Sequence, residues 1–200
     1  DERGRPIGEE LTLAIAIQPV LILRKGPVVI NLSTSKVTAD VAERLGAKVH
    51  YSKVGESNVV EAMRGKRAVI GGEGNGGVIY PAFHSGRDSL IAGALTLSAM
   101  AKRRLTLSEL VDTLPKYFTA KTKAPLKAGF DRQLGAFEKD ASKILGKVKI
   151  DRRDGRRFDF ERGWVQIRTS NTEPIFRLIV ETDDKKLTGE LVDLVRRYFT

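Results

Sequence analysis

In the first half of the chain, short apolar runs alternate with amphipathic segments. Three runs rich in β-branched residues are typical of buried strands, and they cover residues 28–32, 47–51 and 68–70. Helical patterns fill the intervals at residues 35–45 and 57–65, each with a capping residue at its start and a glycine at its end. Strands that alternate with helices predict parallel βαβ units, with ligands bound beyond the carboxyl ends of the strands.

The flanking segments extend this α/β pattern. Residues 9–22 are mostly apolar and predict a helix, interrupted or kinked at Pro19. A long helix over residues 89–102 is expected to begin at Asp88, whose side chain can cap it. Thr106 and Glu109 have the spacing of a capping box and predict a further short helix.

The second half has a different pattern, with strands joined directly to one another. A helix is expected at residues 131–145, a strand at 148–150 and a hairpin turn at Asp154-Gly155. Strands at 163–167 and 175–180 follow, and an amphipathic helix closes the chain. This order predicts a helix-backed antiparallel sheet.

We therefore expect an α/β domain over residues 1–120 and a smaller α+β domain over residues 130–200. The boundary is placed within 121–129, which contains Pro125 and Gly129.

Composition narrows the possible chemistry. The 200 residues are 41% hydrophobic, which is enough for a substantial core, and no apolar run or signal peptide indicates a membrane or an export route. We therefore expect a cytoplasmic protein. The absence of cysteine excludes disulfides, thiolate metal sites and a cysteine nucleophile. With only His50 and His84 available, a histidine-based metal site is not expected, and we assign no metal ligand in this chain.

The net charge of +10 indicates an anionic ligand. From Pro115 onward there are 20 Lys and Arg against 13 Asp and Glu, whereas the preceding part has 15 against 12. Nucleic acid and a sugar phosphate are rival partners for such a basic half. The basic residues are scattered among acids, aromatic residues make up only 6%, and no nucleic-acid-binding motif is present. These features favour a small anion.

The segment between the last two strands, residues 168–174, is dense in hydrogen-bond donors. Arg168 offers a guanidinium fork, Ser170 and Thr172 offer hydroxyls, and Asn171 offers an amide. Backbone N–H groups of the turn can add to them and form a nest for a tetrahedral dianion. An ordinary polar turn, in which these side chains bind their own backbone, explains the same residues. The residue types alone leave both interpretations open.

The sequence Arg168-Thr-Ser-Asn-Thr-Glu-Pro174 resembles the phosphate-binding loop in the fourth domain of the α-D-phosphohexomutases. This family includes phosphomannomutase/phosphoglucomutase and phosphoglucosamine mutase. The resemblance implies that Arg168, Ser170, Asn171 and Thr172 bind phosphate, and Arg177 on the following strand completes the expected set.

A second unusual segment, residues 71–77, contains five glycines. Such a backbone can approach a ligand closely, although a flexible linker would have a similar composition. The segment lacks the Gly-Lys-Ser/Thr ending of a P-loop. Glu73 would repel a phosphate but can accept hydrogen bonds from sugar hydroxyls, and Asn75 can do the same.

Residues 72–76 are similar to the sugar-specificity loop of the same family, Gly-Glu-x-Ser/Asn-Gly, which assigns Glu73 and Asn75 to sugar hydroxyls. Upstream, residues 53–56 are similar to a Lys-x-Gly-x turn that faces the sugar, so Lys53, Gly55 and Glu56 join the expected substrate-binding set. Glu56 stands where His or Asp is common in the family, and Gly77 replaces a frequent His. His84 and Arg87 are further candidates for ligand contact.

The resemblance covers essentially the whole chain but only about half of the usual enzyme, because the opening turn at residues 1–6 resembles one that follows the family's metal-binding loop. It implies an isomerase, an intramolecular phosphotransferase of carbohydrate metabolism that interconverts sugar 1-phosphate and sugar 6-phosphate through a sugar 1,6-bisphosphate. The catalytic phosphoserine and the Mg²⁺ ligands would lie in missing N-terminal domains. This chain is then expected to contain no catalytic residue and to be inactive alone. A non-catalytic phosphosugar-binding protein and a basic nucleic-acid-binding module are the alternatives.

Overall fold

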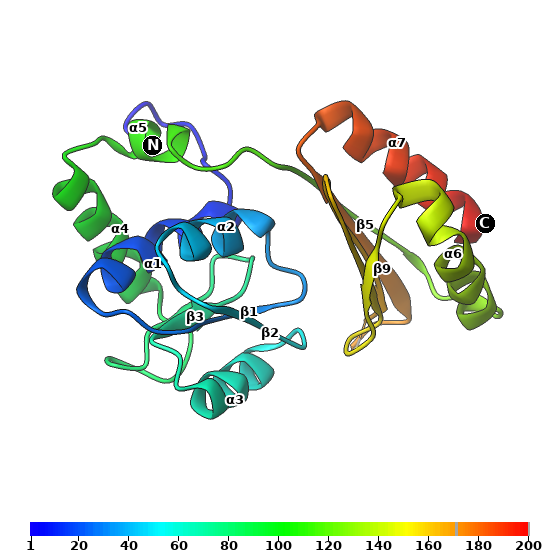
Figure 1. The fold of residues 1–200 in the computed structure, drawn as a ribbon, viewed down its shortest axis with the longest axis horizontal. Helices are drawn as coiled ribbons and strands as arrows, with labels where there is room; N and C mark the ends of the chain where they lie inside the picture. The colour runs from blue at the N-terminus through cyan, green and yellow to red at the C-terminus, as the bar shows by residue number, and fades with distance from the viewer. Residues whose placement is uncertain (171, 200) are drawn as a thin grey trace. The chain divides into compact units, whose positions relative to one another are not determined.

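The computed structural model describes residues 1–170 and 172–199. The chain forms two compact units, Asp1–Lys116 and Tyr117–Thr200, and each has a sheet of its own (Figure 1). No helix in the described part of the chain is both long enough and apolar enough to cross a membrane.

The first unit contains a four-stranded sheet in the order β2-β1-β3-β4. Its strands are β1 (Val28–Asn31), β2 (Val49–Ser52), β3 (Ile70–Gly72) and β4 (Val78–Ile79). β1 pairs in parallel with β2 and β3, which confirms the predicted βαβ units. β4 pairs antiparallel to β3 and was not predicted, because two residues are too few to show a pattern.

Helices cover both faces of this sheet. They are α1 (Glu10–Leu23), α2 (Lys36–Arg44), α3 (Glu56–Lys66), α4 (Ser89–Arg103) and α5 (Leu107–Asp112). Figure 1 shows α1 and α2 on one face and α3 on the other, which explains why all four residues of β1 are buried. The helix α1 continues through Pro19 and packs against α2 and α4, with residues 13–21 buried.

Three of the predicted helix starts are present, whereas the predicted cap of the helix at residues 57–65 is wrong, because α3 begins at Glu56 after Gly55 and has no side-chain cap. Ser35 accepts a hydrogen bond from the backbone of Val37 at 3.2 Å, and Asp88 caps α4 through the N–H groups of its first turn. At α5, Thr106 and Glu109 form the expected capping box.

The second unit is a five-stranded antiparallel sheet in the order β5-β9-β8-β7-β6. Its strands are β5 (Phe118–Pro125), β6 (Lys149–Asp151), β7 (Arg156–Phe160), β8 (Gly163–Thr169) and β9 (Ile175–Thr182). Figure 1 shows α6 (Phe130–Leu145) and α7 (Lys185–Arg196) on one face of it. A short 3-10 helix, Arg197–Phe199, ends the described chain.

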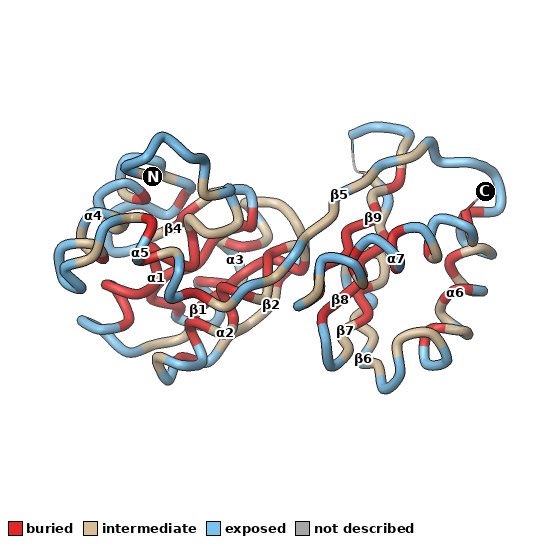
Figure 2. Tube along the Cα trace, turned by 90° about the horizontal axis from the view of Figure 1, so that it is seen from above, coloured by how far each residue is buried: buried red, intermediate tan, exposed pale blue. Residues whose placement is uncertain are grey.

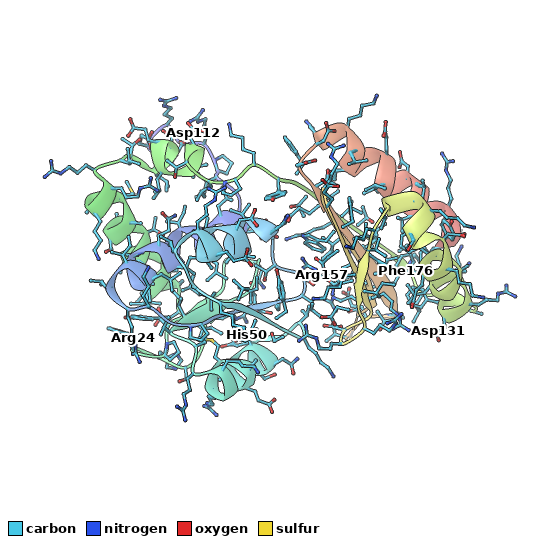
Figure 3. The ribbon with its side chains drawn as sticks, in the orientation of Figure 1. Arg24, His50, Asp112, Asp131, Arg157 and Phe176 are labelled. Atoms are coloured by element: carbon cyan, nitrogen blue, oxygen red, sulfur yellow. The ribbon has the colours of Figure 1, made fainter. Side chains whose placement is uncertain are left out.

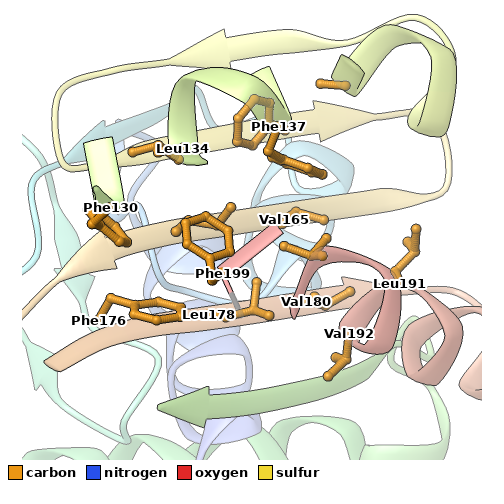
Figure 4. Packing of buried hydrophobic residues seen from close by; sticks show 14 residues of the cluster. Phe130, Leu134, Phe137, Val165, Phe176, Leu178, Val180, Leu191, Val192 and Phe199 are labelled. Atoms are coloured by element: carbon orange, nitrogen blue, oxygen red, sulfur yellow. The ribbon is translucent and has the colours of Figure 1, made fainter. Parts of the chain in front are cut away.

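The core of the second unit lies between this sheet and its helices (Figure 4). Phe130, Phe176 and Phe199 form a cluster of tilted rings, and Phe137 meets Phe158 edge-on at 5.0 Å between centroids. Figure 2 shows the corresponding buried stretches along β8 and β9. Trp164 is also fully buried, but it lies on the other face of the sheet, where the guanidinium of Arg157 is 4.1 Å from its ring centroid.

The strand β5 departs from the expected division of the chain. The sequence predicts a boundary within residues 121–129, but Phe118–Pro125 pairs along its whole length with β9. Pro125 is compatible with a strand here because it lies at the end of an edge strand, where a missing N–H breaks no ladder. The separation between the two units therefore falls before Tyr117.

Candidate functional site

The 71–77 loop is the tight connection between β3 and β4. The backbone N–H of Glu73 donates to the carbonyl of Gly77 at 2.9 Å. Gly72 has φ +155°, and a Cβ there would lie 2.0 Å from that carbonyl oxygen. A Cβ on Gly74 would lie 2.4 Å from Glu10 Oε2. Close contacts within the protein itself thus account for these glycines.

Glu73 is buried at the centre of the first unit's candidate site, with only 5% of its surface exposed. Its Oε1 accepts hydrogen bonds from Asn31 Nδ2 at 2.8 Å and from the backbone N–H of Gly55 at 3.1 Å. Its Oε2 lies 3.5 Å from Arg87 Nη1. Glu73 therefore links the end of β1, the turn at residues 53–56 and the segment before α4.

Asn31 is a site residue that sequence reasoning missed. It is 3% exposed, and its Oδ1 accepts from the backbone N–H of Ser33 and from Thr34 Oγ1, both at 2.9 Å. Its amide group is thus fixed with Nδ2 toward Glu73. An asparagine at the end of an apolar strand was the available signal, because a buried polar group needs hydrogen-bond partners.

Arg87 lies between two carboxylates. Glu56 Oε1 accepts from the backbone N–H of Arg87, and Glu56 Oε2 accepts from its Nε, both at 2.8 Å. Together with the 3.5 Å approach to Glu73, these contacts bring Glu56, Glu73 and Arg87 into one network. A Cβ on Gly77 would lie 2.5 Å from Arg87 Cδ, so the small size of Gly77 leaves room for this arginine.

The pKa of Glu56 is lowered from its ordinary value of 4.5, first by the backbone N–H of Arg87 and then by its guanidinium. This stabilisation is present above pH 4.5 and is lost as the pH falls through the lowered pKa. We expect Arg87→Met to raise the pKa of Glu56 without restoring it fully, because the backbone donor remains. An NMR titration of the Glu56 carboxyl group measures both values. An unchanged pKa in the variant would show that the guanidinium contributes nothing.

The other expected substrate-binding residues lie on the same two loops. Gly55 has φ +116° and begins α3, and its N–H is the donor to Glu73. Lys53 is exposed two positions earlier. Asn75 is exposed as well, and its Oδ1 accepts from the N–H of Gly77 at 3.3 Å, which leaves its NH₂ group as a donor. His84 is also exposed, and its charge contributes to the lowered pKa of Glu56.

In the second unit, the 168–174 loop joins β8 to β9. Ser170 Oγ accepts from the backbone N–H of Thr172 at 3.4 Å, and Arg168 Nη1 donates to the carbonyl of Thr169 at 3.2 Å. Part of this loop therefore satisfies its own backbone, as in an ordinary polar turn. The hydroxyl hydrogens of Ser170 and Thr172 are still available to a ligand. Asn171 lies outside the described residues.

Arg168 and Arg177 are directly opposite one another in the β8–β9 ladder. Like charges at such a position destabilise a sheet, and an anion between or above them removes the penalty. Glu173 supplies part of the compensation, since Arg177 Nη2 donates to its Oε2 at 3.0 Å. Gly155 makes room for Arg168: it has φ +66°, and a Cβ there would lie 2.6 Å from Arg168 Cβ. The pair forms a cationic surface beside the hydroxyls of the loop.

The described residues contain no cluster of three or more His, Cys, Asp or Glu side chains that could hold a metal ion. The carboxylates of the first unit are bound by Asn31, Gly55 and Arg87 instead.

Comparison with known proteins identifies both units. Residues 9–118 match the family model "Phosphoglucomutase/phosphomannomutase, alpha/beta/alpha domain III", and residues 105–197 match the family's C-terminal domain. The α/β unit and the helix-backed sheet are thus the third and fourth domains of α-D-phosphohexomutases. The chain belongs to the phosphoglucomutase/phosphomannomutase family.

Curated relatives give the same result. A phosphoglucomutase/phosphomannomutase from Thermococcus kodakarensis is 37% identical over 97% of this chain and 42% of its own length. A probable phosphoglucosamine mutase from Methanopyrus kandleri is 33% identical over 98% of this chain and 44% of its own. Among solved structures, a putative phosphomannomutase from Thermus thermophilus matches 94% of this chain and 40% of its own, with a TM-score of 0.69 and 25% identity. The chain thus spans less than half the length of these relatives.

Proposed function

We propose that this chain is the sugar- and phosphate-binding part of a longer phosphohexomutase. The whole enzyme would interconvert the 1-phosphate and 6-phosphate of a hexose or hexosamine in the cytoplasm. The observation that carries the proposal is the opposition of Arg168 and Arg177 next to a loop rich in hydroxyl donors.

In this proposal the second unit binds the phosphate that is not reacting. A phosphate monoester is close to a dianion at neutral pH and offers three acceptor oxygens. Arg168 can donate two parallel hydrogen bonds to it, while Arg177 adds charge and the hydroxyls of Ser170 and Thr172 add neutral donors. Asn171 belongs to the proposed set through the family motif.

The first unit binds the sugar. Asn31 and Gly55 hold Oε1 of Glu73, so Oε2 is the oxygen that can accept from a sugar hydroxyl. Asn75 offers its NH₂ group from the same loop, and Lys53 can reach a ligand from the neighbouring turn. Glu56 acts through Arg87, whose position it fixes by two hydrogen bonds.

The transfer of phosphate itself is assigned to residues of the longer enzyme. A phosphoserine and a Mg²⁺ site there would supply the chemistry, and a sugar 1,6-bisphosphate would be the intermediate. The role of this chain is to hold the sugar and one phosphate in place, since catalysis of phosphoryl transfer depends almost entirely on positioning and electrostatic stabilisation.

Two measurements on the 200-residue chain test the proposal. We expect glucose 6-phosphate to shift amide NMR signals of residues 168–177, with little effect from unphosphorylated glucose. We also expect no interconversion of glucose 1-phosphate and glucose 6-phosphate, even with Mg²⁺ and glucose 1,6-bisphosphate. Turnover by rigorously purified chain would overturn the assigned division of roles, and an absence of phosphate-dependent shifts would overturn the binding role.

A further inference from the structure

A row of three basic residues crosses the sheet of the second unit. The register pairs Lys123 of β5 with Arg177 of β9, and Arg177 with Arg168 of β8. Adjacent strands are about 4.8 Å apart, so Lys123 and Arg168 flank Arg177 within about 10 Å of one another at the backbone.

All three residues lie on the sheet face that is turned away from the helices. Their chain neighbours Ala124, Phe176 and Ile167 pack in the core beneath α6 and α7, and side chains alternate between the two faces of a strand. Figure 3 shows the two faces of the sheet at two labelled positions, with Phe176 of β9 on the helix side and Arg157 of β7 on the opposite side.

The 168–174 loop lies at the same end of the sheet as this row. Pro125 pairs with Ile175, and the N–H of Leu126 donates to the carbonyl of Pro174 at 2.9 Å. The end of β5 therefore runs beside the exit of the loop, only a few residues beyond Lys123.

The charges in this row are only partly balanced. Lys123 is exposed, and among the described residues it has no ion pair. Arg177 has Glu173 as its acidic partner, and its Nε is buried without a hydrogen-bond partner in the described part of the chain. Like charges directly opposite one another destabilise a sheet, and an anion bound over this row would reduce that cost.

We propose that Lys123 is a third cation of the phosphate site, which therefore extends from the loop onto the face of the sheet opposite α6 and α7. This inference rests on the proposed function. Arg168 and Arg177 provide planar donors that fix the orientation of the phosphate. Lys123, a compact charge on a flexible stem, attracts the dianion and contacts it from the β5 side.

The test is a comparison of Lys123→Met with Lys186→Met in the 200-residue chain. Both changes remove one exposed lysine, but Lys186 lies on α7, where its charge is 3.7 Å from Glu190 and also acts on Asp184. The affinity for inorganic phosphate and for glucose 6-phosphate is measured by NMR titration at two NaCl concentrations.

We expect Lys123→Met to weaken both affinities about threefold to tenfold and to make them less sensitive to salt, because an exposed charge acts through a screened field. Lys123→Arg should retain affinity, and Lys186→Met should match the unmodified chain. Equal affinities in Lys123→Met and Lys186→Met would overturn the inference. If Arg168→Ala still weakened binding tenfold or more in that case, the proposed function would stand. If the unmodified chain bound no phosphate, both would fail.

Discussion

Replacement of Arg168 by lysine is expected to weaken glucose 6-phosphate binding almost as much as replacement by alanine. A single ammonium cannot reproduce two parallel hydrogen bonds from a planar fork, so the retained positive charge gives little compensation. The expected loss is about 1.5–3 kcal/mol, or roughly tenfold to a hundredfold in Kd. Ser170→Ala removes one neutral donor and should cost less. Calorimetric titration with glucose 6-phosphate and with glucose measures the phosphate-dependent part.

Arg162→Lys provides the matched control. Arg162 is a half-exposed arginine of the same unit, and its Nε donates to Asp183 Oδ1 at 3.0 Å. Its replacement should leave phosphate affinity unchanged. If Arg168→Lys bound as tightly as this control, Arg168 would act only as a point charge. If Arg168→Ala also bound normally, the loop would be a turn without a ligand.

Replacement of Glu73 by alanine is expected to lower both substrate use and stability. In a phosphohexomutase that contains this chain, kcat/KM should fall about a hundredfold, equivalent to about 2.7 kcal/mol. The loop alone suggests an unchanged Tm, but the structure gives the opposite expectation. Asn31 Nδ2 and the N–H of Gly55 would both lose their acceptor, at a cost of about 1–3 kcal/mol in the free energy of unfolding. Urea denaturation of the 200-residue chain measures that cost.

Two further variants separate the roles of Glu73. In Glu73→Gln the remaining carbonyl oxygen can still accept from Asn31 and Gly55, so we expect most of the stability to return while kcat/KM stays low. Glu61→Ala removes an exposed carboxylate of α3 and should change stability by less than about 0.5 kcal/mol. Normal turnover in Glu73→Gln would show that the carboxylate is structural. Unchanged stability in Glu73→Ala would show that its hydrogen bonds contribute nothing to folding.

Helices and strands could be predicted from the sequence where the apolar residues recur with a regular spacing or where a capping residue marks the start of a helix. Ser35, Asp88 and Thr106 mark helix starts through side-chain chemistry that is local in the chain. The place of β5 could not be predicted in this way, since its partner is β9 and its sequence ends in a proline. Long-range pairing at a sheet edge leaves little trace in either strand.

The candidate site was predictable where a motif specifies residue types, and not where contacts depend on folding. Glu73 stands out among glycines, but its bonds to Asn31 and Gly55 join segments that are far apart in the sequence. The contacts of Arg87 could not be predicted either, because its backbone N–H and its guanidinium both bind Glu56 at the start of α3, far away in the sequence. The glycines themselves were interpreted as freedom to approach a ligand, whereas a Cβ on Gly72 or Gly74 would collide with protein atoms.

The pairing of β5 with β9 has a consequence for synthesis on the ribosome. Phe118 pairs with Thr182, so β5, the first strand of the second unit, cannot pair until β9, the last strand in the described residues, has been synthesised. The first unit does not depend on β9, because β1 and β3 pair within Asp1–Lys116. It can therefore fold as soon as that segment has left the ribosome. During the interval, β8 would lack its β9 partner and expose an unpaired edge. The chain is therefore expected to be most prone to aggregation, and most accessible to chaperones, after β8 has been synthesised and before β9 is available to pair with it.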